Sequence, residues 1–217
     1  MTTYENLRVA RRGPIVSIAA YLLLTIAKLI AGHFLNSSSL IADGFNNLSD
    51  ILGNVALLIG LQLASQPADS DHRFGHWKIE DLSSLVTSFI MFVVGFQVLI
   101  QTVRKIFLRE ETVVDPLGAA VGVLSAIVMC AVYFYNKGLA KKLKSSALIA
   151  AAKDNLSDAV TSIGTSIAIV AASFNLTIID YITAIIITFF ILKTAYDIFM
   201  EATFSLSDGF DERNQIG

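Results

Sequence analysis

The chain has 217 residues, of which 54% are hydrophobic and only 16% are charged, and its formal net charge is -2. Soluble domains carry about 25% charged residues, so a single globular core does not account for this much apolar surface. The slightly negative charge argues against nucleic-acid binding, which needs a basic surface. Cys130 is the only cysteine, which excludes an intrachain disulfide and a thiolate metal cluster within one chain.

Six stretches are long and apolar enough to cross a membrane, for which about 20 mostly apolar residues are needed. They cover residues 14–35, 38–65, 80–107, 116–136, 146–174 and 178–204. Capping and turn residues separate them, at Asn36 to Ser39, Asp115-Pro116 and Ser145-Ser146. The first stretch is too long for the apolar part of a signal peptide, and no small-residue cleavage site follows it. We therefore predict an all-α membrane protein with six transmembrane helices.

The distribution of Lys and Arg predicts that both termini are cytoplasmic. Ten basic residues lie on the side of the N-terminus: Arg8, Arg11, Arg12, Arg73, Lys78, Lys137, Lys141, Lys142, Lys144 and Arg213. Three lie on the other side: Arg104, Lys105 and Arg109. Basic residues concentrate in cytoplasmic segments, and an even number of helices agrees with this orientation. The sequence thus predicts a multi-pass protein of the cell membrane.

The second and fifth stretches contain nearly the same pentapeptide. Residues 46–50 read Asn-Asn-Leu-Ser-Asp, and residues 154–158 read Asp-Asn-Leu-Ser-Asp. Small residues surround both copies and suit close helix packing: Gly44, Gly53, Ala151, Ala152 and Gly164. We interpret the two segments as copies of one functional element.

The spacing of the polar residues in these copies suits the binding of one ion. Asn46 and Asp50 are four residues apart, as are Asp154 and Asp158, which places each pair on one helix face about 5–6 Å apart. Asp50 and Asp158 each lie about 12 residues into their helices, or roughly 18 Å deep. Because ionisable groups are costly to bury at this depth, they indicate a functional site. The alternative is a set of neutral, hydrogen-bonded residues that hold the helices together.

The predicted ligand set contains only oxygen donors. Hard ligands of this kind suit Mn²⁺, Mg²⁺ or Ca²⁺, whereas Zn²⁺ favours imidazole and thiolate. Three carboxylates would carry a charge of about -3, and crowded carboxylates titrate as a coupled group. We expect the empty site to hold at least one proton, which a metal displaces. This exchange is a physical basis for metal/proton antiport.

Asp43 and the loop at residues 66–78 have two interpretations each, and two lysines have one. Asp43 lies about one turn outward from Asn46, and is either an exit-path ligand or a carboxylate at a wet cavity mouth. Lys28 and Lys153 lie within the predicted spans and are expected to extend toward the cytoplasm. The loop at residues 66–78 has two histidines and nearby acids, which indicate either a second metal site or a solvated loop.

These motifs resemble those of the cation diffusion facilitator family over nearly the whole sequence. The loop reads Gln66-Pro67-Ala68-Asp69, and then His72-Arg73-Phe74-Gly75-His76-Trp77-Lys78. The resemblance implies a metal/proton antiporter that exports divalent cations from the cytoplasm as a homodimer. By position it implies a transport site of Asn46, Asp50, Asp154 and Asp158. It also implies a cytoplasmic-loop metal site at Asp69, His72 and His76, and a charge cluster of Lys78 and Asp208 at the dimer contact.

The chain differs from the zinc-transporting members of the family at two positions. Those members have Asp where this chain has Asn46, and His where it has Asp154. The pattern is similar to the manganese-exporting branch, while zinc, iron and cobalt are the alternative substrates. We expect residues 1–208 to form the transport domain. Residues 209–217 are expected to begin a linker to a cytoplasmic metal-binding domain that members usually carry and that is absent from this chain.

Two readings from other classes compete with a transporter. An intramembrane aspartyl protease also uses two Asp residues on separate helices, but no Gly-x-Gly-Asp motif occurs in the chain. Pairs of Asp and Asn four residues apart also suit a chelate better than a catalytic dyad. A passive channel builds its filter from rings or carbonyls, and an enclosed four-ligand site binds a cation too tightly for fast conduction.

Overall fold

The computed structural model describes residues 9–63, 77–108 and 114–207. In this part of the chain the regular structure consists of six long helices. They are α2 (Arg12–Phe34), α3 (Ser38–Leu63), α4 (Trp77–Phe107), α5 (Leu117–Leu143), α6 (Ser146–Ser173) and α7 (Thr177–Leu206). The prediction of an all-α protein with six transmembrane helices is confirmed.

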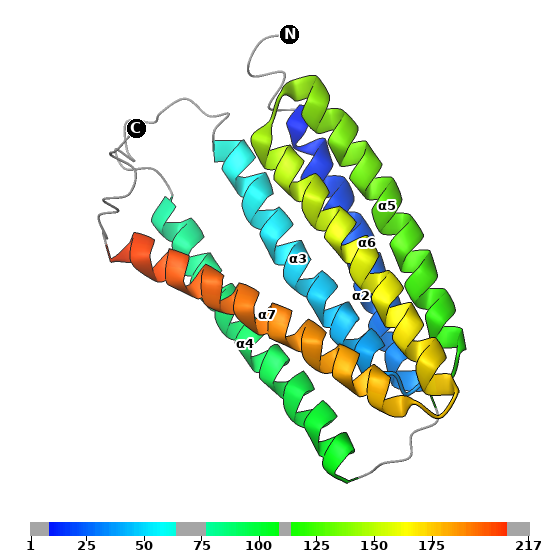
Figure 1. The fold of residues 1–217 in the computed structure, drawn as a ribbon. Helices are drawn as coiled ribbons and strands as arrows, with labels where there is room; N and C mark the ends of the chain where they lie inside the picture. The colour runs from blue at the N-terminus through cyan, green and yellow to red at the C-terminus, as the bar shows by residue number, and fades with distance from the viewer. Residues whose placement is uncertain (1–8, 64–76, 109–113, 208–217) are drawn as a thin grey trace, which may run out of the picture.

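Successive helices run in opposite directions and form two groups. α2, α3, α5 and α6 lie side by side, while α4 packs along α7 and this pair slants away from them toward the upper part of Figure 1. α3 contacts both groups, because it packs on α2 and α6 and also on α7 and α4. We call the end of the bundle at which α2 and α6 begin the N-terminal end, and the other the opposite end.

Five of the six described helices are long and apolar enough to cross a membrane. The exception is α3, whose mean hydropathy is too low. Polar residues lower its hydropathy: Asp43, Asn46, Asn47, Asp50 and Asn54. Each spanning helix exposes large apolar side chains on its outer face, such as Leu23, Leu124 and Phe189, and lipid covers such faces. α3 differs because most of its surface packs against other helices or lines a cavity. The chain is thus a multi-pass membrane protein.

The predicted helix starts hold within a few residues, while one predicted loop is wrong. Ser145 caps α6 by accepting a hydrogen bond from the amide of Leu148 at 3.3 Å. Residues 137–144, between the predicted stretches 116–136 and 146–174, are helical up to Leu143, and Lys144 follows α5 in a left-handed conformation. The lysines of this segment stabilise the extra turns, because positive charge is favourable near a helix C-terminus.

Small residues bring α5 and α6 into close contact, although not all at the predicted positions. A Cβ atom on Gly122 would lie 2.1 Å from Ser166 Oγ and 3.0 Å from the carbonyl oxygen of Ser162, so a larger residue would force Ser166 and the α6 backbone to shift. Gly53 and Gly164 have no neighbour within 4 Å of such an atom. The expectation that these two glycines serve close packing is therefore wrong.

Candidate functional site

All four predicted transport-site residues line one cavity of about 610 Å³ between α3, α6 and α7. They are Asn46, Asp50, Asp154 and Asp158. The lining of α3 continues from Asn46 to Leu57, and that of α6 from Thr161 back to Ala147. Both directions lead to the N-terminal end of the bundle. The cavity therefore opens at that end and reaches inward as far as the polar residues.

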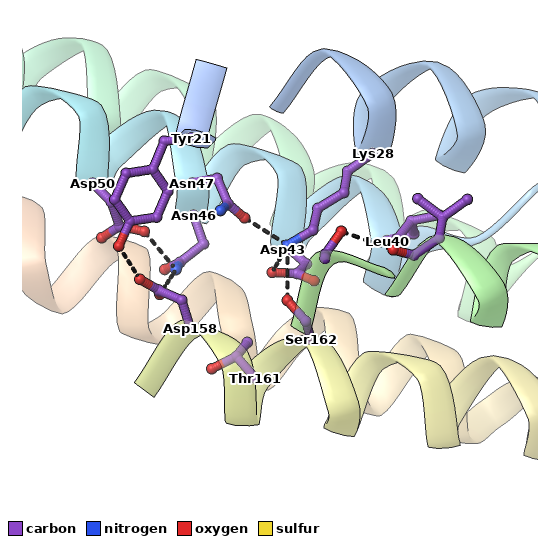
Figure 2. Close-up of polar contacts among 12 residues, drawn as sticks. Tyr21, Lys28, Leu40, Asp43, Asn46, Asn47, Asp50, Asp158, Thr161 and Ser162 are labelled. Carbon is purple, nitrogen blue, oxygen red and sulfur yellow. Dashed lines mark hydrogen bonds and ion pairs between the residues drawn. The ribbon is translucent and has the colours of Figure 1, made fainter. Parts of the chain in front are cut away.

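Asn46 joins the two helices at the inner end of the cavity. Its Nδ2 donates to Asp50 Oδ2 on the same helix and to Asp158 Oδ1 on α6, both at 3.1 Å. Figure 2 shows these three side chains grouped between α3 and α6. The i,i+4 spacing on α3 and the antiparallel course of α6 thus bring an amide and two carboxylates together, as the sequence predicts.

Asp154 lies apart from this group. It lines the same cavity one helical turn from Asp158, but its side chain is exposed and forms no hydrogen bond or ion pair with another described residue. Within residues 9–63, 77–108 and 114–207, no three Asp, Glu, His or Cys side chains lie close enough together to hold a metal. The structure therefore brings three of the four predicted residues into contact and leaves the fourth at the cavity wall.

Tyr21 of α2 holds the carboxylate of Asp158 from the side away from the cavity. The Tyr21 hydroxyl donates to Asp158 Oδ2, and Asn155 Nδ2 donates to the same hydroxyl at 2.9 Å. Asn136 Nδ2 of α5 donates to Asn155 Oδ1 at 2.7 Å and to Ser17 Oγ at 2.8 Å. Tyr21, Asn136 and Asn155 are fully buried. This chain of hydrogen bonds fixes the orientation of Asp158 from three helices.

Toward the opposite end of the bundle, a buried ion pair closes the site. Lys28 Nζ lies 2.9 Å from Asp43 Oδ1, and both side chains are at most 1% exposed. Lys28 Nζ also donates to Asn47 Oδ1 at 2.7 Å and to Ser162 Oγ at 2.9 Å. The expectation that Lys28 extends toward the cytoplasm is wrong, because these three oxygens replace the water that its ammonium would otherwise need. The ion pair buries Asp43, so this residue does not lie at a water-filled cavity mouth.

A second polar cluster closes the opposite end of the bundle around Asp180 of α7. Its carboxylate accepts hydrogen bonds from the hydroxyls of Ser37 and Ser39 and from the amides of Ser38 and Ser39. Lys105 of α4 donates to Ser38 Oγ at 3.1 Å. Asp180 is fully buried. The N-terminus of α3 is therefore capped by another helix, which ties α3, α4 and α7 together at this end.

The structure also explains the second position of the repeated pentapeptide. Asn47 and Asn155 are equivalent in the two copies, and both are fully buried. Both face α2, where Asn47 accepts from Lys28 and Asn155 donates to Tyr21. In each copy the first and last residues thus line the cavity, and the second residue anchors the helix to α2.

The remaining predicted site residues are not placed. Asp69, His72, His76 and Asp208 lie outside the described residues, and the side chain of Lys78 is also outside them although its backbone belongs to α4. Sequence reasoning missed Tyr21, Asn136 and Asp180. Tyr21 had a usable signal, because tyrosine in membrane helices concentrates at the interfaces, whereas Tyr21 lies in the middle of an apolar stretch.

Comparison with known proteins identifies the family. Residues 15–207 match the cation efflux transmembrane domain. The chain is 51% identical over 211 residues to the manganese efflux system protein MneS of Bacillus subtilis, a match that covers 97% of this chain and 73% of MneS. It is 45% identical over 210 residues to the uncharacterized transporter YdbO of the same organism (97% of this chain, 72% of YdbO). It is also 27% identical over 201 residues to the manganese efflux system protein MneP of that organism (89% and 67%). The chain therefore belongs to the cation efflux family, which confirms the resemblance to cation diffusion facilitators.

Proposed function

We propose that this chain exports Mn²⁺ from the cytoplasm in exchange for protons. The observation that carries the proposal is the contact of Asn46 with both Asp50 and Asp158 at the inner end of an open cavity. Oxygen donors from two helices meet there with neither His nor Cys among the lining residues. Such a set suits Mn²⁺ better than Zn²⁺, and the manganese efflux protein MneS is the relative at 51% identity.

Asp154 supplies the fourth ligand in this proposal. It lies one turn from Asp158 on the same cavity wall, so a change of its side-chain rotamer brings its carboxylate toward a cation held by the other three residues. A bound divalent ion offers the free energy for this movement, because it attracts a carboxylate strongly in a site of low dielectric constant. The ion thus completes its own coordination shell.

Proton exchange follows from the crowding of acidic groups. Two carboxylates accept hydrogen bonds from the same Asn46 nitrogen, so their charges lie close together inside the bundle. Like charges at this distance titrate as one coupled group, and binding of Mn²⁺ displaces the proton that they share. Addition of Mn²⁺ to the weakly buffered protein in detergent should release protons, and binding without release would refute the exchange.

Alternating access accounts for transport in this proposal. If the basic N-terminal end faces the cytoplasm, the cavity is open inward, and the clusters around Lys28 and Asp180 close the outward path. The slanted α4–α7 pair is the unit that moves relative to the other helices (Figure 1). Rocking of one helix group around a fixed site is the usual pattern among transporters.

The wider assignments are part of the same proposal. They comprise a homodimer in the lipid bilayer, a charge cluster of Lys78 and Asp208 at its contact, and a loop metal site at Asp69, His72 and His76. Zn²⁺, Fe²⁺ and Co²⁺ are the alternative cargoes. Membership of the cation efflux family favours a transporter over a protease or a passive channel.

Flux in reconstituted vesicles tests the proposal directly. Vesicles with an imposed pH gradient should accumulate Mn²⁺ saturably, and should carry Zn²⁺ more slowly at the same concentration. Collapse of the pH gradient should stop Mn²⁺ accumulation. Vesicles with the Asp50→Ala variant should accumulate no more Mn²⁺ than vesicles without protein. Zn²⁺ flux above that of Mn²⁺ would reassign the cargo, and flux that does not saturate would favour a channel.

A further inference from the structure

The ammonium group of Lys28 occupies a cation-binding position built from three oxygens. Asp43 offers a carboxylate oxygen at 2.9 Å, Asn47 an amide oxygen at 2.7 Å and Ser162 a hydroxyl oxygen at 2.9 Å. Figure 2 shows Lys28 reaching from α2 into the space between α3 and α6 to meet them. A carboxylate and an amide are also the donor types of the neighbouring transport site.

This position is the next step along the groove that holds the transport site. Asp43 lies three residues before Asn46 on α3, and Ser162 lies four residues after Asp158 on α6. Because α3 and α6 run in opposite directions, both shifts lead about one helical turn toward the opposite end of the bundle. The cavity lining stops at Asn46 and Thr161, so the Lys28 position begins where the open path ends.

We propose that Lys28 is a tethered cation that fills the first outward position of the transport path and thereby bars the metal from the closed half. This inference rests on the proposed function. Two cations in neighbouring positions repel each other strongly where the dielectric constant is low, so Mn²⁺ in the transport site does not advance while Lys28 stays. When Lys28 leaves, the carboxylate of Asp43 becomes a ligand on the exit path.

A purely structural role explains the arrangement less well. Buried ion pairs are weak contributors to stability, because desolvation opposes the attraction of the charges. Ionisable groups inside a membrane are also rare unless they serve transport. Among the described residues, Asn47 Nδ2 has no hydrogen-bond partner, and the carboxylate of Asp43 has Lys28 alone. A network built only for stability would satisfy these atoms, whereas a position that exchanges its cation needs a carboxylate that no other group holds, as is the case for Asp43.

Metal binding separates the two roles. The Lys28→Met variant removes the ammonium and keeps the carboxylate of Asp43, so in equilibrium dialysis the folded protein should bind Mn²⁺ at least about 10-fold more tightly than the wild type. The Lys28→Met/Asp43→Asn double variant removes the carboxylate as well and should return to the wild-type affinity, as should Lys28→Arg. A folded Lys28→Met protein with the wild-type affinity for Mn²⁺ would overturn the proposal.

Leak measurements extend the test to a variant that has no unpaired buried charge. Vesicles loaded with Mn²⁺ and held without a pH gradient should lose it at least about 10-fold faster with Lys28→Met/Asp43→Asn than with Lys28→Arg, because the fixed positive charge is gone. Equal leak rates would overturn the tethered-cation proposal alone, provided that the wild-type protein accumulates Mn²⁺. Absence of wild-type Mn²⁺ transport would instead refute the proposed function.

Discussion

The two halves of the bundle use the same helices in opposite ways. Toward the N-terminal end, α3 and α6 turn Asp50, Asp154 and Asp158 to a cavity of about 610 Å³. Toward the opposite end, the same two helices turn Asp43 and Ser162 to the ammonium of Lys28. One half thus leaves its oxygen atoms available to a cation from outside the bundle, and the other supplies a cation of its own.

This difference shows that polar contacts, rather than apolar side chains, close a polar path inside a membrane. Apolar side chains alone would leave the oxygens of α3 and α6 without partners, which is costly in a medium without water. In the closed half, Lys28 is the partner of oxygens from Asp43, Asn47 and Ser162, while Asp180 of α7 accepts hydrogen bonds from the start of α3. The polar path is therefore closed by polar contacts, and the predictions below test each half in turn.

The largest effect is expected in the open half, at Asp158. The Asp158→Ala variant should lower Mn²⁺ efflux more than about 100-fold, because loss of even an outer partner of a metal ligand costs 10–100-fold. Initial rates in vesicles measure this effect. Ser157→Ala removes a neighbouring side chain from the same cavity lining and serves as the control. Efflux by Asp158→Ala near the wild-type rate would remove Asp158 from the site.

In the closed half, Asp180→Ala should destabilise the protein by about 3 kcal/mol, because it leaves several buried donors of Ser37 to Ser39 unsatisfied. Thermal unfolding in detergent measures the loss. Ser207→Ala is the control just after the end of α7, since the exposed Ser207 hydroxyl donates to the carbonyl oxygen of Phe204 at 3.0 Å and such a bond contributes about 1 kcal/mol. Equal unfolding temperatures for the two variants would show that the Asp180 cluster does not hold this end together.

The contact between α2 and the open half predicts a role for Tyr21 in positioning. A hydrogen bond to a charged acceptor contributes about 1.5–3 kcal/mol, so Tyr21→Phe should weaken Mn²⁺ binding by roughly 10-fold or more while the maximal rate changes less. Dissociation constants and the dependence of flux on Mn²⁺ concentration measure the two quantities separately. Tyr133→Phe on α5 removes a hydroxyl whose donor among the described residues is Lys137, and it should have no effect. A lower maximal rate with unchanged affinity would contradict positioning.

A smaller effect is expected at the fourth predicted ligand. Asp154→His introduces an imidazole at the cavity wall and should raise the ratio of Zn²⁺ to Mn²⁺ flux by about 5–10-fold, since Zn²⁺ prefers nitrogen ligands to carboxylates. Competition between the two ions in the same vesicles measures this ratio. The Asp154→Asn variant controls for loss of the negative charge alone. Unchanged fluxes of both ions in Asp154→His would remove Asp154 from the ligand set.

The sequence by itself determined the features that depend on local order along the chain. Hydropathy set the approximate limits of five helices, because each span has to satisfy its own backbone hydrogen bonds in lipid, while α3 is less apolar than the others. The spacing of the repeated pentapeptide set which residues share a helix face, and the cavity contains all four residues chosen on that basis. Family membership followed from the same motifs.

Only the tertiary structure decided which partner each polar side chain takes. Lys28 was expected to extend to water, yet it meets Asp43, because packing of α2 on α3 seals it from either surface. Tyr21 and Asp180 are separated in sequence from their partners by more than 130 residues, and no periodicity within one helix indicates such contacts. The cavity also opens at one end for a tertiary reason, because α7, which borders it together with α3 and α6, slants away from them toward the N-terminal end (Figure 1). Helix faces are encoded locally, whereas the meeting of two faces depends on how whole helices pack.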